Sequence, residues 1–291
     1  MGIRTLATSF ERVQRAEGRS PWTRKLYQDC IRRLAVFAEA ETGSDDLAGL
    51  TRRLLTDFYA ARAETCARST VWTDWKVHRV YLKWLVSEDE MAVNPMDRMK
   101  APRQTSNPVP VLSDESLRAL VAACEGSGYR DRRDMALVRL LIDCGLRRTE
   151  LCSICIGDLD LDHALLTVTG KTKTRTVAFG SKSSVALDRW LRVRGRRTDA
   201  DGSDLLWRGL TPSGLYQALR GRAESAGIKD WHPHQMRHTF AHQWLAARGG
   251  ETDLMQITGW SSVSMLRRYG ASAASERARA AQRRLALGDR F

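Results

Sequence analysis

A polar, proline-rich segment over residues 94–110 divides the sequence into two parts. It contains Pro95, Pro102, Pro108 and Pro110. Proline lacks the N–H that an interior helical position donates, and it pushes the preceding residue towards extended conformations. No helix is therefore expected to cross this segment, and 291 residues are enough for a core on each side. The sequence predicts two domains, residues 1–100 and 111–291, joined by a linker over residues 101–110.

The first domain is predicted to be all helical. Apolar residues recur at spacings of three and four near 23–37, 51–63 and 69–85. Thr23 is the expected N-cap of the first of these helices. Lysine and arginine side chains are interleaved along all three. They form either an ordinary solvated surface or a surface that follows the phosphates of a nucleic acid.

An arginine-containing bend is predicted early in the second domain. A helical stripe of apolar residues ends at Gly145 and is followed by the sequence Leu-Arg-Arg-Thr-Glu-Leu. Arg147 then lies on a short bend, with Thr149 able to cap the next helix. The pattern alone fits either a surface ion pair between Arg147 and Glu150 or an arginine held rigidly enough for catalysis.

A β-hairpin is predicted next. Two short β-prone runs, 165–169 and 175–179, flank the sequence Gly-Lys-Thr-Lys-Thr. The turn carries Lys171 and Lys173. Solvated lysines are the ordinary occupants of such turns, so the hairpin alone assigns them no function.

The C-terminal part of the chain carries a helix suited to binding a phosphate. Pro233 fits a first helical position, and apolar residues recur at helical spacing until Gly249 ends the run. His234 and Arg237 are three residues apart, so they project from one face of its first turn. Free backbone N–H groups and the positive end of the helix dipole favour an anion there.

A turn and a tyrosine follow this helix. A short helix over residues 252–258 is expected to end at Gly259, with Trp260 in the connecting turn. A further helix, which Ser261 or Ser262 can cap, is expected to carry Tyr269.

This C-terminal segment resembles the signature of the tyrosine recombinases, the family of phage integrases and Xer-type resolvases. The signature is His-x-x-Arg on a helix, then Gly followed by His or Trp, then a nucleophilic Tyr nine residues later. His234, Arg237, Trp260 and Tyr269 match it. Many members carry His at the position of Trp260, and Trp is a known variant within the family.

Two further motifs extend the resemblance. Gly-Leu-Arg-x-Thr-Glu-Leu around Arg147 resembles the first catalytic motif of the family. The family carries its catalytic lysine on the hairpin, directly after the Gly, and Lys171 matches that place, with Lys173 as the alternative. The resemblance implies an all-α N-terminal core-binding domain and a mixed, mainly α catalytic domain with a small antiparallel β-sheet.

The matching residues are suited to phosphoryl transfer. The site implied by the resemblance consists of Arg147, Lys171, His234, Arg237, Trp260 and Tyr269. A guanidinium is always charged and its planar fork matches phosphate, so two arginines can replace the metal ions that nucleases commonly use. Tyr269 would attack phosphorus, and Lys171 would protonate the departing 5′-oxygen. His234 would act as the base or as a hydrogen-bond donor to the phosphate. Trp260 would offer its indole N–H to the phosphate.

Composition limits the alternatives. The net charge of +13 fits a polyanionic partner, or a basic protein from an arginine-rich proteome. No carboxylate cluster occurs, and the single C-x-x-C, Cys152 to Cys155, has no second pair or His at zinc spacing beside it, so we expect no metal and no cofactor. The six cysteines show no paired framework. No run of 18 apolar residues exists and the N-terminus lacks an apolar leader, so we expect a cytoplasmic, nucleoid-associated protein without a membrane partner.

The resemblance implies a site-specific recombinase or integrase. Such an enzyme cleaves and rejoins DNA through a covalent 3′-phosphotyrosine and exchanges strands through a Holliday junction. The implied partners are double-stranded recombination sites, a homo-tetramer on DNA that is a monomer or dimer when free, and accessory DNA-bending proteins. A type IB topoisomerase shares the chemistry, and a DNA-binding regulator with a dead site is the alternative from another class.

Overall fold

The computed structural model divides the chain into two compact units, Met1–Asn107 and Pro108–Phe291. The structure describes residues 1–103, 110–170, 173–196, 204–262, 266, 278–279 and 282–290. Each unit buries its own hydrophobic cluster. The tail helix that carries Tyr269 in the sequence prediction lies outside the described residues.

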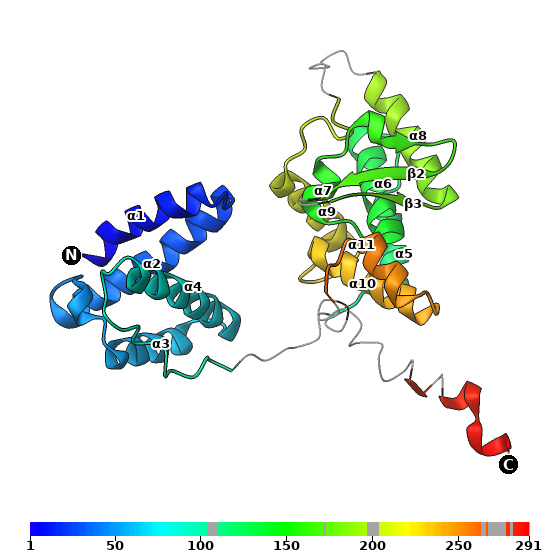
Figure 1. Ribbon diagram of the computed structural model, residues 1–291. Coiled ribbons are helices and arrows are strands. Elements are labelled where there is room, and N and C mark those ends of the chain that lie inside the picture. Colours follow the sequence, from blue (N-terminus) through cyan, green and yellow to red (C-terminus); the bar gives the residue numbers. More distant parts are fainter. Residues whose placement is uncertain are drawn as a thin grey trace. The chain divides into compact units, whose positions relative to one another are not determined.

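The N-terminal unit is a bundle of helices (Figure 1). Its elements are α1 (Ile3–Ala16), α2 (Pro21–Thr42), the 3-10 helix η1 (Leu47–Gly49), α3 (Arg52–Thr65) and α4 (Arg68–Ser87). Within its described residues, the one β feature is an isolated bridge between Gly2 and Asp46. The prediction of an all-helical first domain is confirmed.

Helix α2 is the centre of this bundle, because α1, α3 and α4 all pack against it. Its inward side chains Ile31 and Leu34 are fully buried, as are Leu55 of α3 and Leu82 of α4. The expectation that Thr23 caps α2 is wrong. Ser20 takes the N-cap position and its Oγ accepts the N–H of Thr23 at 3.2 Å, because Pro21 suits the first helical position and brings no N–H to satisfy.

The second unit combines helices with one small sheet (Figure 1). Its helices are α5 (Asp114–Ala122), α6 (Tyr129–Cys144), α7 (Arg148–Cys152), η2 (Ile156–Asp158), α8 (Ser181–Gly195), α9 (Pro212–Ser225), α10 (Pro233–Ala246), α11 (Glu251–Thr258) and η3 (Leu287–Arg290). Its strands are β1 (Leu159–Asp160), β2 (Leu165–Thr169) and β3 (Thr174–Ala178). The prediction of a mainly α unit with a small antiparallel sheet is confirmed.

The sheet has the strand order β1-β2-β3, and both pairings are antiparallel. Leu166 of β2 lies opposite Val177 of β3, and both are buried. The predicted hairpin is therefore present, with its second strand beginning one residue earlier than expected. The sequence did not predict β1, because two residues are too short for any periodic signal.

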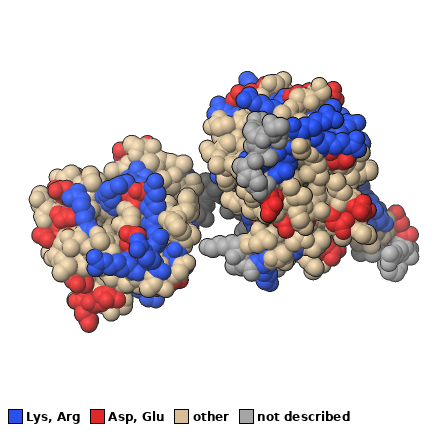
Figure 2. Space-filling model, turned by 90° about the horizontal axis from the view of Figure 1, so that it is seen from above, with Lys and Arg blue, Asp and Glu red and all other residues tan. Residues whose placement is uncertain are grey.

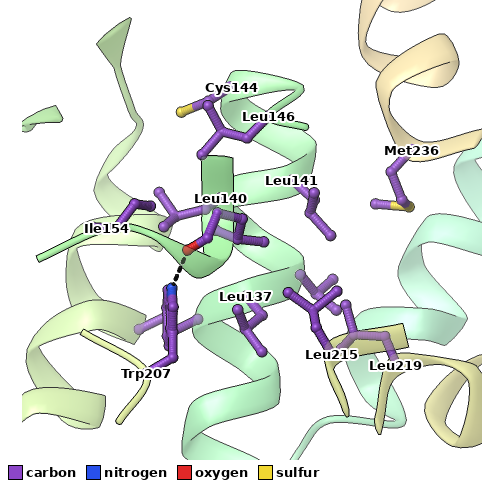
Figure 3. Close-up of a cluster of buried hydrophobic side chains, with 14 of the residues drawn as sticks. Leu137, Leu140, Leu141, Cys144, Leu146, Ile154, Trp207, Leu215, Leu219 and Met236 are labelled. Atoms are coloured by element: carbon purple, nitrogen blue, oxygen red, sulfur yellow. Dashed lines mark hydrogen bonds between the residues drawn. The ribbon is translucent and has the colours of Figure 1, made fainter. Parts of the chain in front are cut away.

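Helix α6 is the central support of the second unit. The side chains of Leu137, Leu140 and Leu141 are fully buried, and Leu215 and Leu219 of α9 lie beside them (Figure 3). The indole N–H of Trp207 donates to the carbonyl of Leu151 at 2.7 Å, which fastens the end of α7 to this core. The bend between α6 and α7 is thus held between well-packed elements.

The start of α7 differs from the sequence prediction. Thr149 does not cap this helix; Arg147 occupies the N-cap position and Arg148 is the first helical residue. The side chain of Glu150 supplies the cap instead, because one carboxylate oxygen accepts the backbone N–H of Arg147 at 2.9 Å. A carboxylate three residues into a helix is well placed for this role.

Candidate active site

The bend that carries Arg147 depends on a glycine. Gly145 ends α6 with a φ of 55°, in the left-handed region that glycine adopts without penalty. A Cβ added there would lie 2.4 Å from a ring carbon of Phe240 on α10. The bend is therefore pressed against α10, the helix that carries the His-x-x-Arg motif.

Arg147 is fixed at both its backbone and its side chain. One of its terminal nitrogens donates to Glu150 Oε1 at 2.6 Å, and the other donates to the carbonyl of Gly259 at 3.4 Å. Its side chain nevertheless remains 38% exposed. The ion pair and the exposed guanidinium are therefore compatible, and the two interpretations of this residue that the sequence left open are not exclusive.

Arg237 is the buried counterpart of Arg147. It is 1% exposed, and its terminal nitrogens donate to the carbonyls of Gly145 at 2.8 Å and Thr258 at 2.6 Å. Its guanidinium carbon lies 5.3 Å from the ring centroid of Trp260, which is itself buried. Arg237 thus links the turn at the end of α6 to the turn at the end of α11, and the side chain of Arg147 contacts the second of these turns.

His234 lies on the first turn of α10 and is exposed. Its ring lies 5.0 Å, centroid to centroid, from the ring of His238 at a near-perpendicular angle. A hollow of about 550 Å³ is lined by His234 together with Arg147 and Tyr216 of α9. The structure therefore brings the histidine and the bend arginine to one open surface.

A second, larger hollow of about 1030 Å³ adjoins the first. Arg147 and Thr149 line both, and the second also includes Lys173, Gly259 and Trp260. Four of the six predicted site residues therefore border or underlie this region. The other two, Lys171 and Tyr269, lie outside the described residues.

Sequence reasoning missed Arg175, which lies on β3. Its side chain is 10% exposed and donates to both carboxylate oxygens of Glu150, at 3.1 and 2.9 Å. The alternation of side chains along the predicted strand could have identified Arg175. Side chains two residues apart share one face of a strand, so Arg175 lies on the same face as Val177, which is buried. Arginine is almost never found at such a position without a partner.

The charge of Glu150 is stabilised by its partners. Burial by itself would raise the pKa of this carboxyl, but hydrogen bonds from Arg175 and Arg147 more than offset it, and its pKa lies below the usual value. The carboxylate is therefore ionised whenever the site is folded near neutral pH.

Metal ligands and membrane spans were sought among the described residues. No group of three or more His, Cys, Asp or Glu side chains there could hold a metal ion. No helix in that part of the chain is long and apolar enough to cross a membrane. Lysine and arginine side chains gather in patches on the surfaces of both units (Figure 2).

Comparison with known proteins identifies the class. Residues 110–276 match the phage integrase family. The tyrosine recombinase XerC of Mycobacterium tuberculosis is 33% identical over 266 residues, covering 87% of this chain and 88% of the relative. XerC of Chromobacterium violaceum is 28% identical over 265 residues, covering 87% and 85%.

Solved structures show the same fold. XerH bound to a palindromic difH substrate, in a post-cleavage complex, has a TM-score of 0.76 at 19% identity and covers 95% of this chain and 84% of its own. A lambda integrase dimer bound to a COC′ core site has a TM-score of 0.75 at 12% identity, covering 93% and 77%. The structural similarity supports the fold, and the sequence matches support the family.

The chain belongs to the phage integrase family. It is a tyrosine-type site-specific recombinase, an enzyme that breaks and rejoins DNA strands. These matches do not favour the topoisomerase or the catalytically dead regulator as alternatives.

Proposed function

We propose that Arg147, Lys171, His234, Arg237, Trp260 and Tyr269 form the active site of this recombinase. One observation carries the proposal: Arg147 and Arg237 both donate to carbonyls of the turn at Thr258–Gly259, and Arg237 also donates to the carbonyl of Gly145, two residues before Arg147. Arg147 holds a positive charge at the open surface and Arg237 holds a buried one beside Trp260, and together they can stabilise the charge that develops on the non-bridging oxygens of a phosphodiester.

Tyr269 is the nucleophile in this proposal. Its oxygen forms a bond to phosphorus while the bond from phosphorus to the 5′-oxygen breaks, which leaves a 3′-phosphotyrosine and a 5′-hydroxyl. His234 accepts the phenol proton or donates to the phosphate, and Lys171 protonates the departing oxygen. A 5′-hydroxyl from another strand reverses the step, so strands are exchanged through a Holliday junction without ATP.

The N-terminal unit is assigned a DNA-binding role. We place a core-binding domain at residues 1–100, a linker at 101–110 and the catalytic domain at 111–291. Two solved relatives, XerH on difH and lambda integrase on COC′, are bound to recombination sites. We propose that this chain likewise binds double-stranded sites, and that it does so as a homo-tetramer in the cytoplasm, at the nucleoid, together with accessory DNA-bending proteins.

Trapping of the covalent intermediate tests the proposal. A site with a nick beside the scissile phosphate loses its short 5′-hydroxyl fragment, so the protein should accumulate as a DNA adduct. We expect this adduct with the natural chain in excess EDTA and not with Tyr269→Phe, measured by denaturing gel electrophoresis. Adduct formation by Tyr269→Phe would remove the nucleophile assignment, and a requirement for added Mg²⁺ would overturn the metal-free chemistry.

Sulfur substitution separates the two hairpin lysines. A thiolate leaves without protonation, so DNA with sulfur at the bridging 5′ position should restore most of the cleavage lost by Lys171→Ala. Lys173→Ala is the matched control and should need no such rescue. If the rescue follows Lys173→Ala instead, the acid role moves to Lys173, which lines the larger hollow.

A further inference from the structure

We propose that Arg175 is a positioning residue for catalysis: it holds the carboxylate of Glu150, and through it sets the guanidinium of Arg147. This inference rests on the proposed role of Arg147 in binding the phosphate. Arg175 lies on β3 and belongs to none of the motifs in the sequence.

All three nitrogens of Arg175 donate hydrogen bonds within the unit. Its Nε donates to the carbonyl of Ile257 at 2.6 Å, and its two terminal nitrogens donate to the two oxygens of Glu150. Each of its three nitrogens is thus engaged within the unit. With a side chain only 10% exposed, Arg175 acts on the reaction through its partners.

Glu150 links Arg175 to Arg147, because its carboxylate accepts hydrogen bonds from both. Its Oε1 accepts from both arginines, at 3.1 Å from Arg175 and 2.6 Å from Arg147. Its Oε2 accepts from Arg175 and from the backbone N–H of Arg147. A carboxylate held by one bidentate arginine has a fixed plane, so the second arginine meets an acceptor of fixed direction. Without Arg175, the carboxylate would keep only its two contacts with Arg147, one from the backbone N–H and one from the guanidinium, and its plane would be less firmly held.

Arg175 also joins three segments that carry proposed site residues. It lies four positions after Lys171 on the hairpin, its carboxylate partner caps the helix that follows Arg147, and its carbonyl partner lies three residues before Trp260. A Cβ built on Gly259 would lie 3.3 Å from one nitrogen of Arg175 and 3.7 Å from one of Arg147, so both guanidinium groups flank this turn. One side chain therefore fixes the spacing of the bend, the hairpin and the turn.

Lysine cannot replace this arrangement. Three donors in a rigid plane are needed to reach two oxygens of one carboxylate and a carbonyl at once, whereas an ammonium is a compact point charge. Arg175→Lys keeps the charge and loses the fork. We expect it to fold and to cleave about 100-fold more slowly at saturating DNA, because misplacement of a catalytic group by about 1 Å costs about that factor.

The test uses the full chain and a matched control within the same unit. Arg222 also contacts two carboxylate oxygens and one carbonyl: Asp134 at 2.9 Å, Asp131 at 2.7 Å and Ala123 at 2.9 Å. Arg175→Lys, Arg175→Met, Arg222→Lys and Arg222→Met are compared by adduct formation on nicked DNA and by thermal unfolding. The Arg222 variants should lose stability while keeping the natural adduct rate below their unfolding temperature.

Cleavage of DNA with an uncharged phosphate analogue distinguishes a positioning role of Arg175 from a purely structural one. Replacing one non-bridging oxygen by methyl removes the charge that Arg147 is proposed to neutralise. The defects of Arg147→Ala and of both Arg175 variants should shrink together on this methylphosphonate, and Arg147→Ala combined with Arg175→Lys should cleave no more slowly than Arg147→Ala alone. Multiplied defects in the double variant, no relief on the neutral phosphate, or loss of folding in both Arg175 variants would overturn the inference. Absence of any adduct with the natural chain would instead contradict the proposed function itself.

Discussion

Each unit of this recombinase buries a carboxylate between two arginines, but the two arrangements serve different ends. In the N-terminal unit, Asp74 of α4 is fully buried and accepts from Arg33 at 2.6 Å and Arg62 at 3.1 Å. In the second unit, Glu150 is almost as buried and accepts from Arg175 and Arg147. The chemical groups are the same, so the difference must come from where the arginines lie.

The arginines of Asp74 come from two other helices of one bundle. Arg33 lies on α2 and Arg62 on α3, so the carboxylate joins three helices and its ion pairs hold the scaffold. Arg147 instead lies on a bend at the rim of two hollows, and Gly259 offers its side chain only a long contact of 3.4 Å. Arg33 and Arg147 are similarly exposed, at 35% and 38%, so exposure alone does not separate the two networks. They differ in what the arginines adjoin: Arg33 and Arg62 join helices of one bundle, whereas Arg147 lines two hollows that an anion can enter.

The largest effect should follow loss of the arginine at the open site. We expect Arg147→Ala to slow adduct formation about 10³-fold, because removing one group that stabilises the developing charge costs about that factor. Its unfolding free energy should fall by only about 1 kcal/mol, since Glu150 keeps Arg175. Nicked-site cleavage and denaturant unfolding measure the two effects. If Arg147→Ala lost several kcal/mol of unfolding free energy and kept the natural rate of adduct formation, Arg147 would belong to the scaffold and not to the site.

The sequence predicted the local structure around these two networks only in part. The glycine signal predicted the end of α6 at Gly145 and its bend correctly, since it depends on backbone conformation over a few residues. The caps proposed at Thr23 and Thr149 were wrong because a neighbouring residue, Ser20 or Glu150, offered the better acceptor.

Long-range pairs were not predictable in this way. Arg33 and Asp74 are 41 residues apart and Glu150 and Arg175 are 25 apart, so no local pattern links them. Motif resemblance selected Arg147, His234, Arg237 and Trp260 because chemistry constrains them. It passed over Arg175, whose partners become apparent only when β3 packs on α7 and α11. Lys171 and Tyr269 stay predictions, since they lie outside the described residues.

The second effect should follow loss of the charge on the scaffold carboxylate. Asp74→Asn keeps the shape and removes the charge, which leaves Arg33 and Arg62 without a counter-ion. Breaking a buried pair from one side costs about 3–5 kcal/mol, so we expect a loss in unfolding free energy near the lower figure. The adduct rate of the folded fraction at saturating DNA should not change. A large fall in that rate would show that the Asp74 network reaches the chemistry.

The scaffold should also respond to acid through a buried histidine beside this network. The imidazole of His78 lies between Tyr59 Oη at 2.9 Å and the carbonyl of Cys30 at 3.0 Å, and burial lowers its pKa from 6.5 to about 4. Because the unfolded chain takes up the proton more readily, the stability from the neutral ring is full above pH about 6.5 and is lost as the pH falls to about 4.

This loss should reach about 3 kcal/mol, as each unit of pKa difference corresponds to about 1.4 kcal/mol. Hydrogen exchange across this pH range should show amides of α2 and α4 losing protection before those of α6. The pKa of Glu150 lies below its usual value of 4.5, so its contribution is lost only as the pH falls below about 4.5. Equal acid sensitivity of the two cores, or an unchanged pH profile in His78→Asn, would contradict the assignment.

The smallest effect should come from replacing an arginine of the Asp74 network by lysine. The same replacement at Arg175 is expected to impair cleavage. Arg62 donates to Asp74 through Nε alone, and a lysine ammonium can supply one such bond to the same carboxylate oxygen. Asp74 also keeps the shorter contact from Arg33. We therefore expect Arg62→Lys to lower the unfolding free energy by about 1 kcal/mol and to leave the adduct rate at saturating DNA unchanged. Denaturant midpoints and single-turnover cleavage, measured beside Arg175→Lys, complete the comparison. If Arg62→Lys slowed cleavage as much as Arg175→Lys, fork geometry would matter equally in both networks, and the distinction between scaffold and site would fail.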